Sequence, residues 1–204
     1  MTARLHVYGT DSSERRLVPL ALALIAVFGA IAIDRWGPHR AWSPSWLYSP
    51  PVDTMALYGI LWAFFDRVAW RWGIFRVLKI VQVPHLSGRW RGVAKPVLTP
   101  GPSEGLQRDV AITLRIKQTW STIQIAAETE FSRSQSLSAT VVIGEPALLS
   151  YEYQNEPLVN AASTMQPHRG SARLELIEGT RFTGEYYSGR SRQNVGQIVL
   201  ERTE

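Results

Sequence analysis

The alternation of apolar and polar residues that begins at Ser87 limits the fold of this chain more than any other feature. A period of two is typical of a strand with one buried face. Gly, Pro, Asn and Ser interrupt the pattern at regular intervals, and no helical period appears between the interruptions. The sequence predicts eight strands, at residues 88–95, 109–118, 121–130, 136–144, 147–154, 168–178, 180–187 and 194–202.

Short connections join most of these strands, which favours antiparallel neighbours and a closed sheet. The two longer connections are residues 96–107 and 155–167. Closing eight strands into a barrel removes the exposed sheet edges and leaves an interior for side chains or one small ligand. We therefore expect residues 85–204 to form a small all-β domain, an eight-stranded antiparallel lipocalin-like β-barrel.

The alternation also indicates which residues face the barrel interior. Residues expected to face inward include Leu114, Ile125, Leu137, Val141, Leu149, Leu174 and Phe182. Polar residues of the same parity are expected to surround a mouth: Gln118, Tyr153, Asn155, His168 and Tyr186. An apolar interior with a few converging polar groups is typical of a small-molecule pocket.

The N-terminal part of the chain, residues 1–84, has a different character. Residues 17–33 form a run of 17 residues without a charge, directly after Arg15 and Arg16. This run predicts a transmembrane helix at the short end of the usual length. A secretory signal peptide is the alternative, because Ala30 and Ala32 form an A-x-A-like site after the apolar run.

A second apolar segment at about residues 52–70 predicts a second span, and hence a two-helix transmembrane hairpin. Its uncharged stretch, residues 54–65, is only 12 residues long and is followed by Asp66 and Arg67. Two interpretations of this pair stay open. It marks the end of the helix, or Asp66 faces another helix and, with Arg67 and Arg71, helps an oligomer to form in the membrane.

The distribution of charge points to a membrane surface and not to a DNA or RNA polymer. Residues 1–80 carry nine Lys and Arg against five Asp and Glu, whereas residues 81–204 carry 13 against 12. The net charge of +5 therefore belongs mainly to the apolar part of the chain. Basic residues before the first span and after the second place both termini in the cytosol.

Enzymatic chemistry finds little support in the sequence. There is no cysteine, which excludes disulfides, thiolate metal sites and a cysteine nucleophile. The four histidines form no HExxH motif, and there is no glycine-rich phosphate loop. The segment GRSRQ around Ser191 lacks the second glycine of a nucleophile elbow. We predict a non-enzymatic protein without catalytic residues, metal or cofactor.

Five segments together resemble a known family: SGRWRG, TWSTIQI, YEYQNEP, HRGSARLEL and FTGEYYSGRSRQNVGQIVLER. The chain resembles the CBASS antiphage membrane effectors with two transmembrane helices and a cyclic-nucleotide-sensing eight-stranded β-barrel, the SMODS-associated β-strand-rich transmembrane effectors. The resemblance implies a multi-pass protein of the bacterial inner membrane whose cytosolic barrel binds a cyclic dinucleotide. It further implies that binding drives self-assembly, membrane disruption and abortive infection.

A cyclic dinucleotide presents phosphates and bases, so its receptor needs cationic or N–H donors and aromatic faces. The residues predicted to bind it are Tyr153, Asn155, His168, Arg169, Tyr186, Arg190 and Arg192. A second function also stays open, that of a membrane-tethered barrel that binds an apolar small molecule. The Gly-x-Trp sequence that ends at Trp90 resembles the lipocalin signature, which places this tryptophan in the core.

The predicted topology is directly testable. A reporter enzyme fused after Glu204 is expected to be active in the cytosol, because the barrel follows two spans. Recovery of a processed protein that starts near Ile33 would instead establish the signal-peptide alternative.

Overall fold

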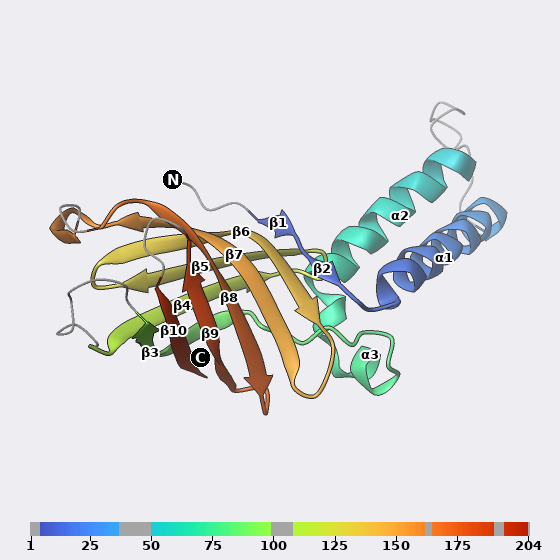
Figure 1. Ribbon diagram of the computed structural model, residues 1–204. Helices are drawn as coiled ribbons and strands as arrows, with labels where there is room; N and C mark the ends of the chain where they lie inside the picture. Colours follow the sequence, from blue (N-terminus) through green and yellow to red (C-terminus); the bar gives the residue numbers. More distant parts are fainter. Residues whose placement is uncertain (1–4, 37–49, 99–107, 162–164, 190–193, 204) are drawn as a thin grey trace. The chain divides into compact units, whose positions relative to one another are not determined.

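The computed structural model describes residues 5–36, 50–98, 108–161, 165–189 and 194–203 (Figure 1). The described residues divide into two compact units, one formed by Ser12–Gln82 and the other by Met1–Asp11 together with Val83–Glu204. We describe each unit by itself.

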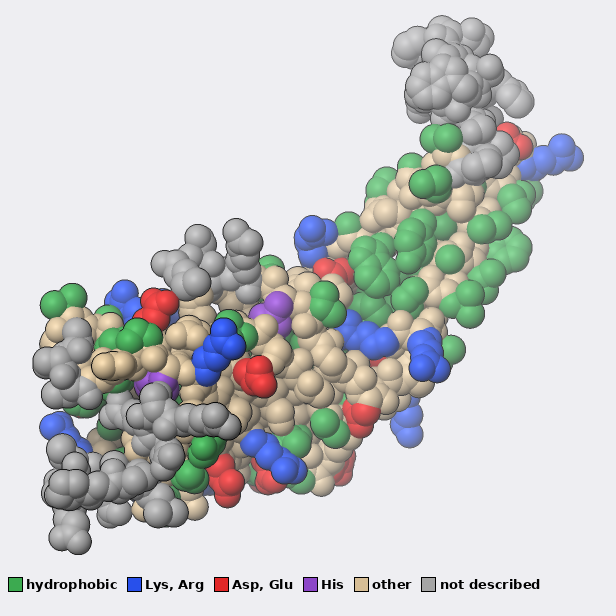
Figure 2. Space-filling view, turned by 45° about the horizontal axis from the view of Figure 1, so that its top comes forward, with side chains coloured by type: hydrophobic (Ala, Val, Ile, Leu, Met, Phe, Trp, Pro, Cys, Tyr) green, Lys and Arg blue, Asp and Glu red, His purple; other side chains and the backbone are tan. Residues whose placement is uncertain are grey.

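The first unit is helical. It contains α1 (Glu14–Trp36), α2 (Pro50–Arg67), a 3₁₀ turn, η2 (Ala69–Arg71), and the short α3 (Gly73–Val77). Apolar side chains cover much of the visible surface of α1 and α2 (Figure 2). Within the described residues, α1 is the single helix long and apolar enough to cross a bilayer. The second span therefore stays a prediction.

Small residues let α1 and α2 pack closely. Ala26 and Ala30 are fully buried in this unit. A Cβ added at Gly29 would lie 2.6 Å from a methyl carbon of Leu57, so no larger residue fits there without a shift of that side chain. Close helix packing through small residues is common in membranes, where burial of apolar surface gives no driving force for association.

The second unit is a closed barrel of eight strands, as the sequence predicts. All neighbouring strands are antiparallel, in the order β5-β4-β3-β10-β9-β8-β7-β6, and β6 pairs with β5 to close the ring. The strands are β3 (Gly88–Leu98), β4 (Val110–Gln118), β5 (Thr122–Thr129), β6 (Ser132–Val142), β7 (Ala147–Pro157), β8 (His168–Ile177), β9 (Arg181–Ser188) and β10 (Val195–Arg202). A 3₁₀ turn, η3 (Val159–Ala161), follows β7.

The ring is weakest between β5 and β6. Only three residue pairs join these strands, beside their hairpin, whereas each of the other neighbouring pairs has at least seven. The N-terminal residues fill the gap that remains. Strand β1 (His6–Val7) pairs with β5, and β2 (Gly9–Thr10) pairs with β6. Residues 5–11, which we name the N-terminal strap, thus help to complete the barrel wall, a role that no local pattern of the sequence predicts.

Side-chain contacts hold the N-terminal strap in place. Tyr8 is 3% exposed, and its hydroxyl donates to the carbonyl of Trp120 at 2.8 Å and accepts from the Gln118 amide at 3.3 Å. Toward the end of the strap, the backbone N–H of Ile143 donates to the Asp11 carboxylate at 2.9 Å. The strap is therefore part of the barrel core as well as of its sheet.

Trp90 lies in the barrel core, as predicted. Its side chain is fully buried, its ring lies 4.3 Å from that of Phe182, and its indole N–H donates to the Leu86 carbonyl at 3.0 Å. The Arg202 guanidinium lies 4.5 Å from the Trp90 ring, a cation–π distance.

Two sequence predictions about the interior are wrong. Gln118 does face inward, but its carboxamide binds the backbone of Leu86 and Pro84 and the Tyr8 hydroxyl, away from the cavity described below. The alternation along a strand predicts whether a side chain faces the barrel interior. It does not predict at which end of the barrel that side chain lies. Leu137 is 45% exposed because an irregularity between Ser136 and Ser138 shifts the alternation.

The strap can be tested by paired substitutions at adjacent positions. Tyr8→Ala is expected to lower the free energy of unfolding by at least about 2 kcal/mol, because it removes a buried ring. Val7→Ala is expected to cost within about 0.5 kcal/mol, because Val7 is 77% exposed. Denaturant unfolding of the full chain in detergent measures both. If Tyr8→Ala lowers the free energy of unfolding as little as Val7→Ala does, the buried Tyr8 ring contributes no specific stabilisation to the barrel.

Candidate ligand-binding site

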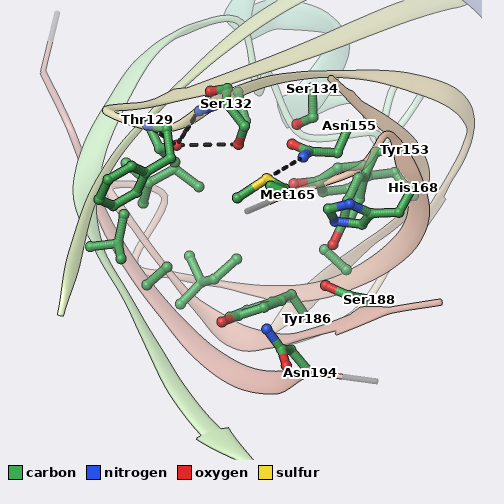
Figure 3. Close-up of a pocket in the computed structure, with 18 residues that line it drawn as sticks. Thr129, Ser132, Ser134, Tyr153, Asn155, Met165, His168, Tyr186, Ser188 and Asn194 are labelled. Atoms are coloured by element: carbon green, nitrogen blue, oxygen red, sulfur yellow. Dashed lines mark hydrogen bonds between the residues drawn. The ribbon is translucent and has the colours of Figure 1, made fainter. Parts of the chain in front are cut away.

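The barrel interior contains a cavity of about 160 Å³ (Figure 3). The cavity and Trp90 lie at different levels along the barrel. Trp90 pairs with Leu114, whereas Ala94, four residues further along β3, pairs with Val110, and both Ala94 and Val110 line the cavity. All eight barrel strands contribute to its lining, because each strand turns alternate residues inward.

The cavity combines an apolar part with many polar groups. The apolar part consists mainly of Ala94, Val110, Ile112, Ala127, Ala172 and Ile198. The polar groups are the side chains of Thr129, Ser132, Ser134, Tyr151, Tyr153, Asn155, His168, Tyr186, Ser188 and Asn194. Among the described residues, the lining contains no Asp, Glu, Lys or Arg. Such a wall suits a flat polar ring better than a buried charge.

Two tyrosines of the lining each lie over a glycine on a neighbouring strand. Tyr153 pairs with Gly170, and Tyr186 pairs with Gly196. A Cβ at either glycine would lie 2.4 Å from the tyrosine side chain, so only glycine leaves room for the ring. The Tyr153 hydroxyl also donates to the Tyr187 carbonyl at 3.4 Å. The sheet thus fixes both rings against its inner wall.

Asn155 and His168 form a cross-strand pair between β7 and β8. Both are inward-facing and more than nine-tenths buried, with 7% and 9% of their surfaces exposed. The His168 Nδ1 lies 2.9 Å from the Gln166 carbonyl, which can only accept, so Nδ1 carries the proton. In the neutral ring, Nε2 is therefore an acceptor. The Asn155 Nδ2 lies 3.4 Å from the thioether sulfur of Met165, a weak acceptor.

The hairpin between β5 and β6 contributes part of the cavity rim. The Thr129 hydroxyl accepts hydrogen bonds from the backbone N–H groups of Phe131 and Ser132 at 3.2 and 3.0 Å. A threonine that binds the backbone two and three residues ahead fixes a tight turn. Phe131 and Ser132 are positioned in the lining in this way.

Tyr151 lies deeper, with 6% of its surface exposed and its ring centroid 6.1 Å from that of Tyr153. Burial, and to a lesser extent the neighbouring Tyr153, raises the pKa of the Tyr151 hydroxyl above its ordinary value. The hydroxyl therefore stays protonated at physiological pH and remains a hydrogen-bond donor.

The comparison with known protein families identifies this barrel. Residues 81–202, more than half of the chain, match the family described as "Cap15, cyclic dinucleotide receptor domain". The chain belongs to the Cap15 family. This confirms the resemblance to the cyclic-nucleotide-sensing CBASS effectors.

Two similar proteins are both named CD-NTase-associated protein 15. The CD-NTase-associated protein 15 of Yersinia aleksiciae is 26% identical over 195 residues, which cover 92% of this chain and 88% of that protein. The CD-NTase-associated protein 15 of Staphylococcus schleiferi is 24% identical over 166 residues, which cover 79% and 82%. Both similarities extend beyond the receptor domain into the helical unit.

The cavity of the Cap15 domain brings together four of the seven residues predicted to bind ligand, namely Tyr153, Asn155, His168 and Tyr186. Arg169 is absent from the lining; it is exposed, and its Nε donates to the Gln154 side chain at 3.4 Å. Arg190 and Arg192 lie outside the described residues. Ligand contact by any of the seven stays a prediction.

The residues predicted to act in the membrane lie at and after the end of α2. Asp66 is half-buried in the last turn, and the exposed Arg67 donates to the Ala63 carbonyl at 3.4 Å. The exposed Arg71 guanidinium lies 5.6 Å from the Trp70 ring. These positions are compatible with both interpretations of the charged pair.

Several lining residues of the Cap15 cavity were not predicted. Ser188 was accessible to the same reasoning, because it shares the parity of Tyr186 on β9. Asn194 was also accessible, because it begins the predicted strand at residues 194–202 and shares the parity of the buried Ile198 and Leu200. Met165 lies outside the predicted strands, where no alternation indicates a direction. Ser132 and Ser134 lie before residue 136, where the predicted strand begins, so they were assigned no inward side.

Proposed function

We propose that this chain is an antiphage defence effector that binds a cyclic dinucleotide in its barrel cavity. Once the ligand is bound, the protein self-assembles and disrupts the bacterial inner membrane, which causes abortive infection. The observation that carries the proposal is the aromatic and polar cavity inside a domain that belongs to the Cap15 cyclic dinucleotide receptor family.

The aromatic and polar side chains of the lining match the chemical groups of a cyclic dinucleotide, namely its bases, riboses and phosphates. Tyr153 and Tyr186 offer ring surfaces on which a base can stack, and the hydroxyl and amide groups can bind ribose or phosphate oxygens. This density of polar groups favours a nucleotide over the apolar molecule that the Gly-x-Trp sequence left open. The ligand activates the protein, and the proposal requires neither a cofactor nor a catalytic residue.

Arg190 and Arg192 are proposed to bind the phosphates. The segment that contains them begins and ends at the cavity, because Ser188 and Asn194 both line it. The Ser188 N–H also donates to the Asn194 carbonyl at 2.8 Å. Each arginine is two residues in the sequence from a lining residue, and its charge can compensate a phosphate for which the described lining offers no Lys or Arg.

The N-terminal strap connects the proposed receptor to the proposed membrane anchor. The hairpin between β5 and β6 contributes to the cavity lining, and the strap fills the gap between the same two strands. The strap ends at Asp11, and α1 begins at Glu14. A ligand that shifts this hairpin can therefore act on α1 through a very short connection.

In the membrane, we propose that α1 and α2 form a two-pass hairpin with both termini in the cytosol. The second span has few uncharged residues for a hydrocarbon core about 30 Å thick. Such a mismatch favours thinning of the bilayer or association with other copies. Gathered hairpins would bring Asp66 of one copy near Arg67 or Arg71 of another.

Ligand binding can be tested with two adjacent tyrosines. Tyr186 lines the cavity, whereas Tyr187 is outside the lining and 46% exposed. Tyr186→Ala is expected to weaken cyclic dinucleotide binding about tenfold or more, because base stacking contributes about 1–3 kcal/mol. Tyr187→Ala is expected to bind like the parent. Calorimetry on the full chain in detergent measures both affinities, and equal affinities in the two variants would place the ligand elsewhere.

The membrane step can be tested at Asp66. Asp66→Leu is expected to leave expression, insertion and nucleotide binding intact while reducing ligand-triggered membrane depolarisation, because the charge that joins neighbouring hairpins is lost. Asp53→Leu, at the other end of α2, serves as the matched control. The measurement uses cells that produce equal amounts of each protein. Depolarisation by Asp66→Leu that matches the parent would leave this residue only the role of marking the helix end.

A further inference from the structure

Residues 71–80, which include α3 and follow the end of α2, expose apolar and basic side chains together. We name them the α3 segment. We propose that the α3 segment lies in the interface of the bilayer and binds the headgroups of anionic phospholipids. The inference rests on the proposed membrane anchoring by the helical unit and adds the class of lipid that this unit recognises. It does not depend on cyclic dinucleotide binding.

The α3 segment is almost entirely exposed although more than half of its residues are apolar. Phe75 is half-buried, and every other residue of the segment is exposed. The exposed apolar side chains are those of Trp72, Ile74, Val77, Leu78 and Ile80. Ile74, Val77 and Leu78 are three and four residues apart, so they lie on one side of the helical turn. Neighbouring exposed apolar side chains of this kind mark an interaction surface.

This apolar surface continues that of α2. Ile60, Phe64 and Val68 are all exposed and are spaced by four residues, which places them in one stripe along the helix. The N–H of Val68 still donates to the Phe64 carbonyl, at 2.9 Å. The Phe64 ring lies 5.7 Å from that of Trp72, edge to face. The apolar surface therefore extends from α2 to the α3 segment, and one apolar environment suits both.

Aromatic and backbone contacts hold the α3 segment against the end of α2. The Phe75 ring lies 5.7 Å from the Phe65 ring and 6.3 Å from the Trp72 ring. The N–H groups of Ile80 and Val81 both donate to the Phe75 carbonyl, at 2.8 and 3.1 Å. The exposed side chains are thus presented by a folded turn of defined backbone structure.

The charge of this region favours an anionic partner. Residues 67–80 contain four basic side chains, those of Arg67, Arg71, Arg76 and Lys79, and all four are exposed. The sequence has no acidic residue between Asp66 and Glu104. Anionic lipids at a membrane surface attract cations placed close to it. Cations beside exposed apolar side chains are typical of a segment that lies in the bilayer interface, where long basic side chains reach the headgroups.

The position of the α3 segment can be measured with site-specific labels, because the chain has no cysteine. Val77→Cys carries an environment-sensitive fluorophore on the segment, and Val159→Cys carries the same fluorophore on the barrel. The two valines are 79% and 97% exposed. In vesicles of phosphatidylglycerol and phosphatidylcholine, the label at residue 77 is expected to emit at shorter wavelength than the label at residue 159. Phospholipids with a quencher in the headgroup region are expected to quench it more strongly.

The class of lipid can be measured by competition. The full chain in detergent is equilibrated with equal amounts of phosphatidylglycerol and phosphatidylcholine, repurified, and analysed for bound lipid by mass spectrometry. We expect a preference for phosphatidylglycerol. Arg76→Gln combined with Lys79→Gln is expected to lower this preference about tenfold, because each cation near an anionic surface contributes about fivefold.

A matched variant controls for total charge. Arg91→Gln combined with Lys117→Gln removes one arginine and one lysine from exposed positions of the barrel. This variant is expected to keep the parental preference for phosphatidylglycerol, because neither residue belongs to the α3 segment.

The results separate this inference from the proposed function. A label at residue 77 that is as exposed to water as the label at residue 159, in protein that resists alkaline extraction from vesicles, overturns the inference and leaves the membrane anchoring standing. Shielding of residue 77 that appears in detergent only as the protein concentration rises overturns it in favour of contact between copies.

The lipid measurement gives a second decision. A preference for phosphatidylglycerol that survives the substitutions at Arg76 and Lys79, or that the barrel control loses equally, overturns the assignment of anionic lipid to the α3 segment. Extraction of the parent protein from vesicles by alkaline washing overturns the proposed membrane anchoring itself, and the inference with it.

Discussion

Closure of the barrel between β5 and β6 is the constraint on which the rest of this structure depends. Three residue pairs join these strands directly, and the N-terminal strap pairs with two further residues of each strand. Unpaired strand edges are costly when buried and prone to association when exposed. The segment that completes the sheet leads directly into α1, so the same residues close the barrel and connect it to the apolar helix.

The cavity is a consequence of this closure. In a closed ring each strand must turn alternate residues inward, and all eight therefore contribute to one lining. Glycines at 170 and 196 leave room for Tyr153 and Tyr186 against the wall, so the barrel retains space for a small ring. Among the described residues the lining has no Asp, Glu, Lys or Arg, which favours a flat polar ring over a buried charge.

Much of the candidate site was accessible from the sequence, because the period of a strand assigns each residue to a side. Tyr153, Asn155, His168 and Tyr186 were found by parity together with residue type. Arg169 was selected by type alone, although the residue after an inward-facing His168 must point outward in a regular strand. Met165 could not be found, because it lies outside the predicted strands and follows no period.

The sequence by itself determined the eight strands, the apolar helix α1 and the buried Trp90, because period, composition and turn residues are local properties. Tertiary structure decided which residues meet. It placed Gln118 away from the cavity, turned Leu137 outward through an irregularity in β6, and set Asn155 opposite His168. It also brought the N-terminal strap into a gap more than 100 residues away in the chain. These outcomes depend on strand register and long-range pairing, which no local pattern encodes.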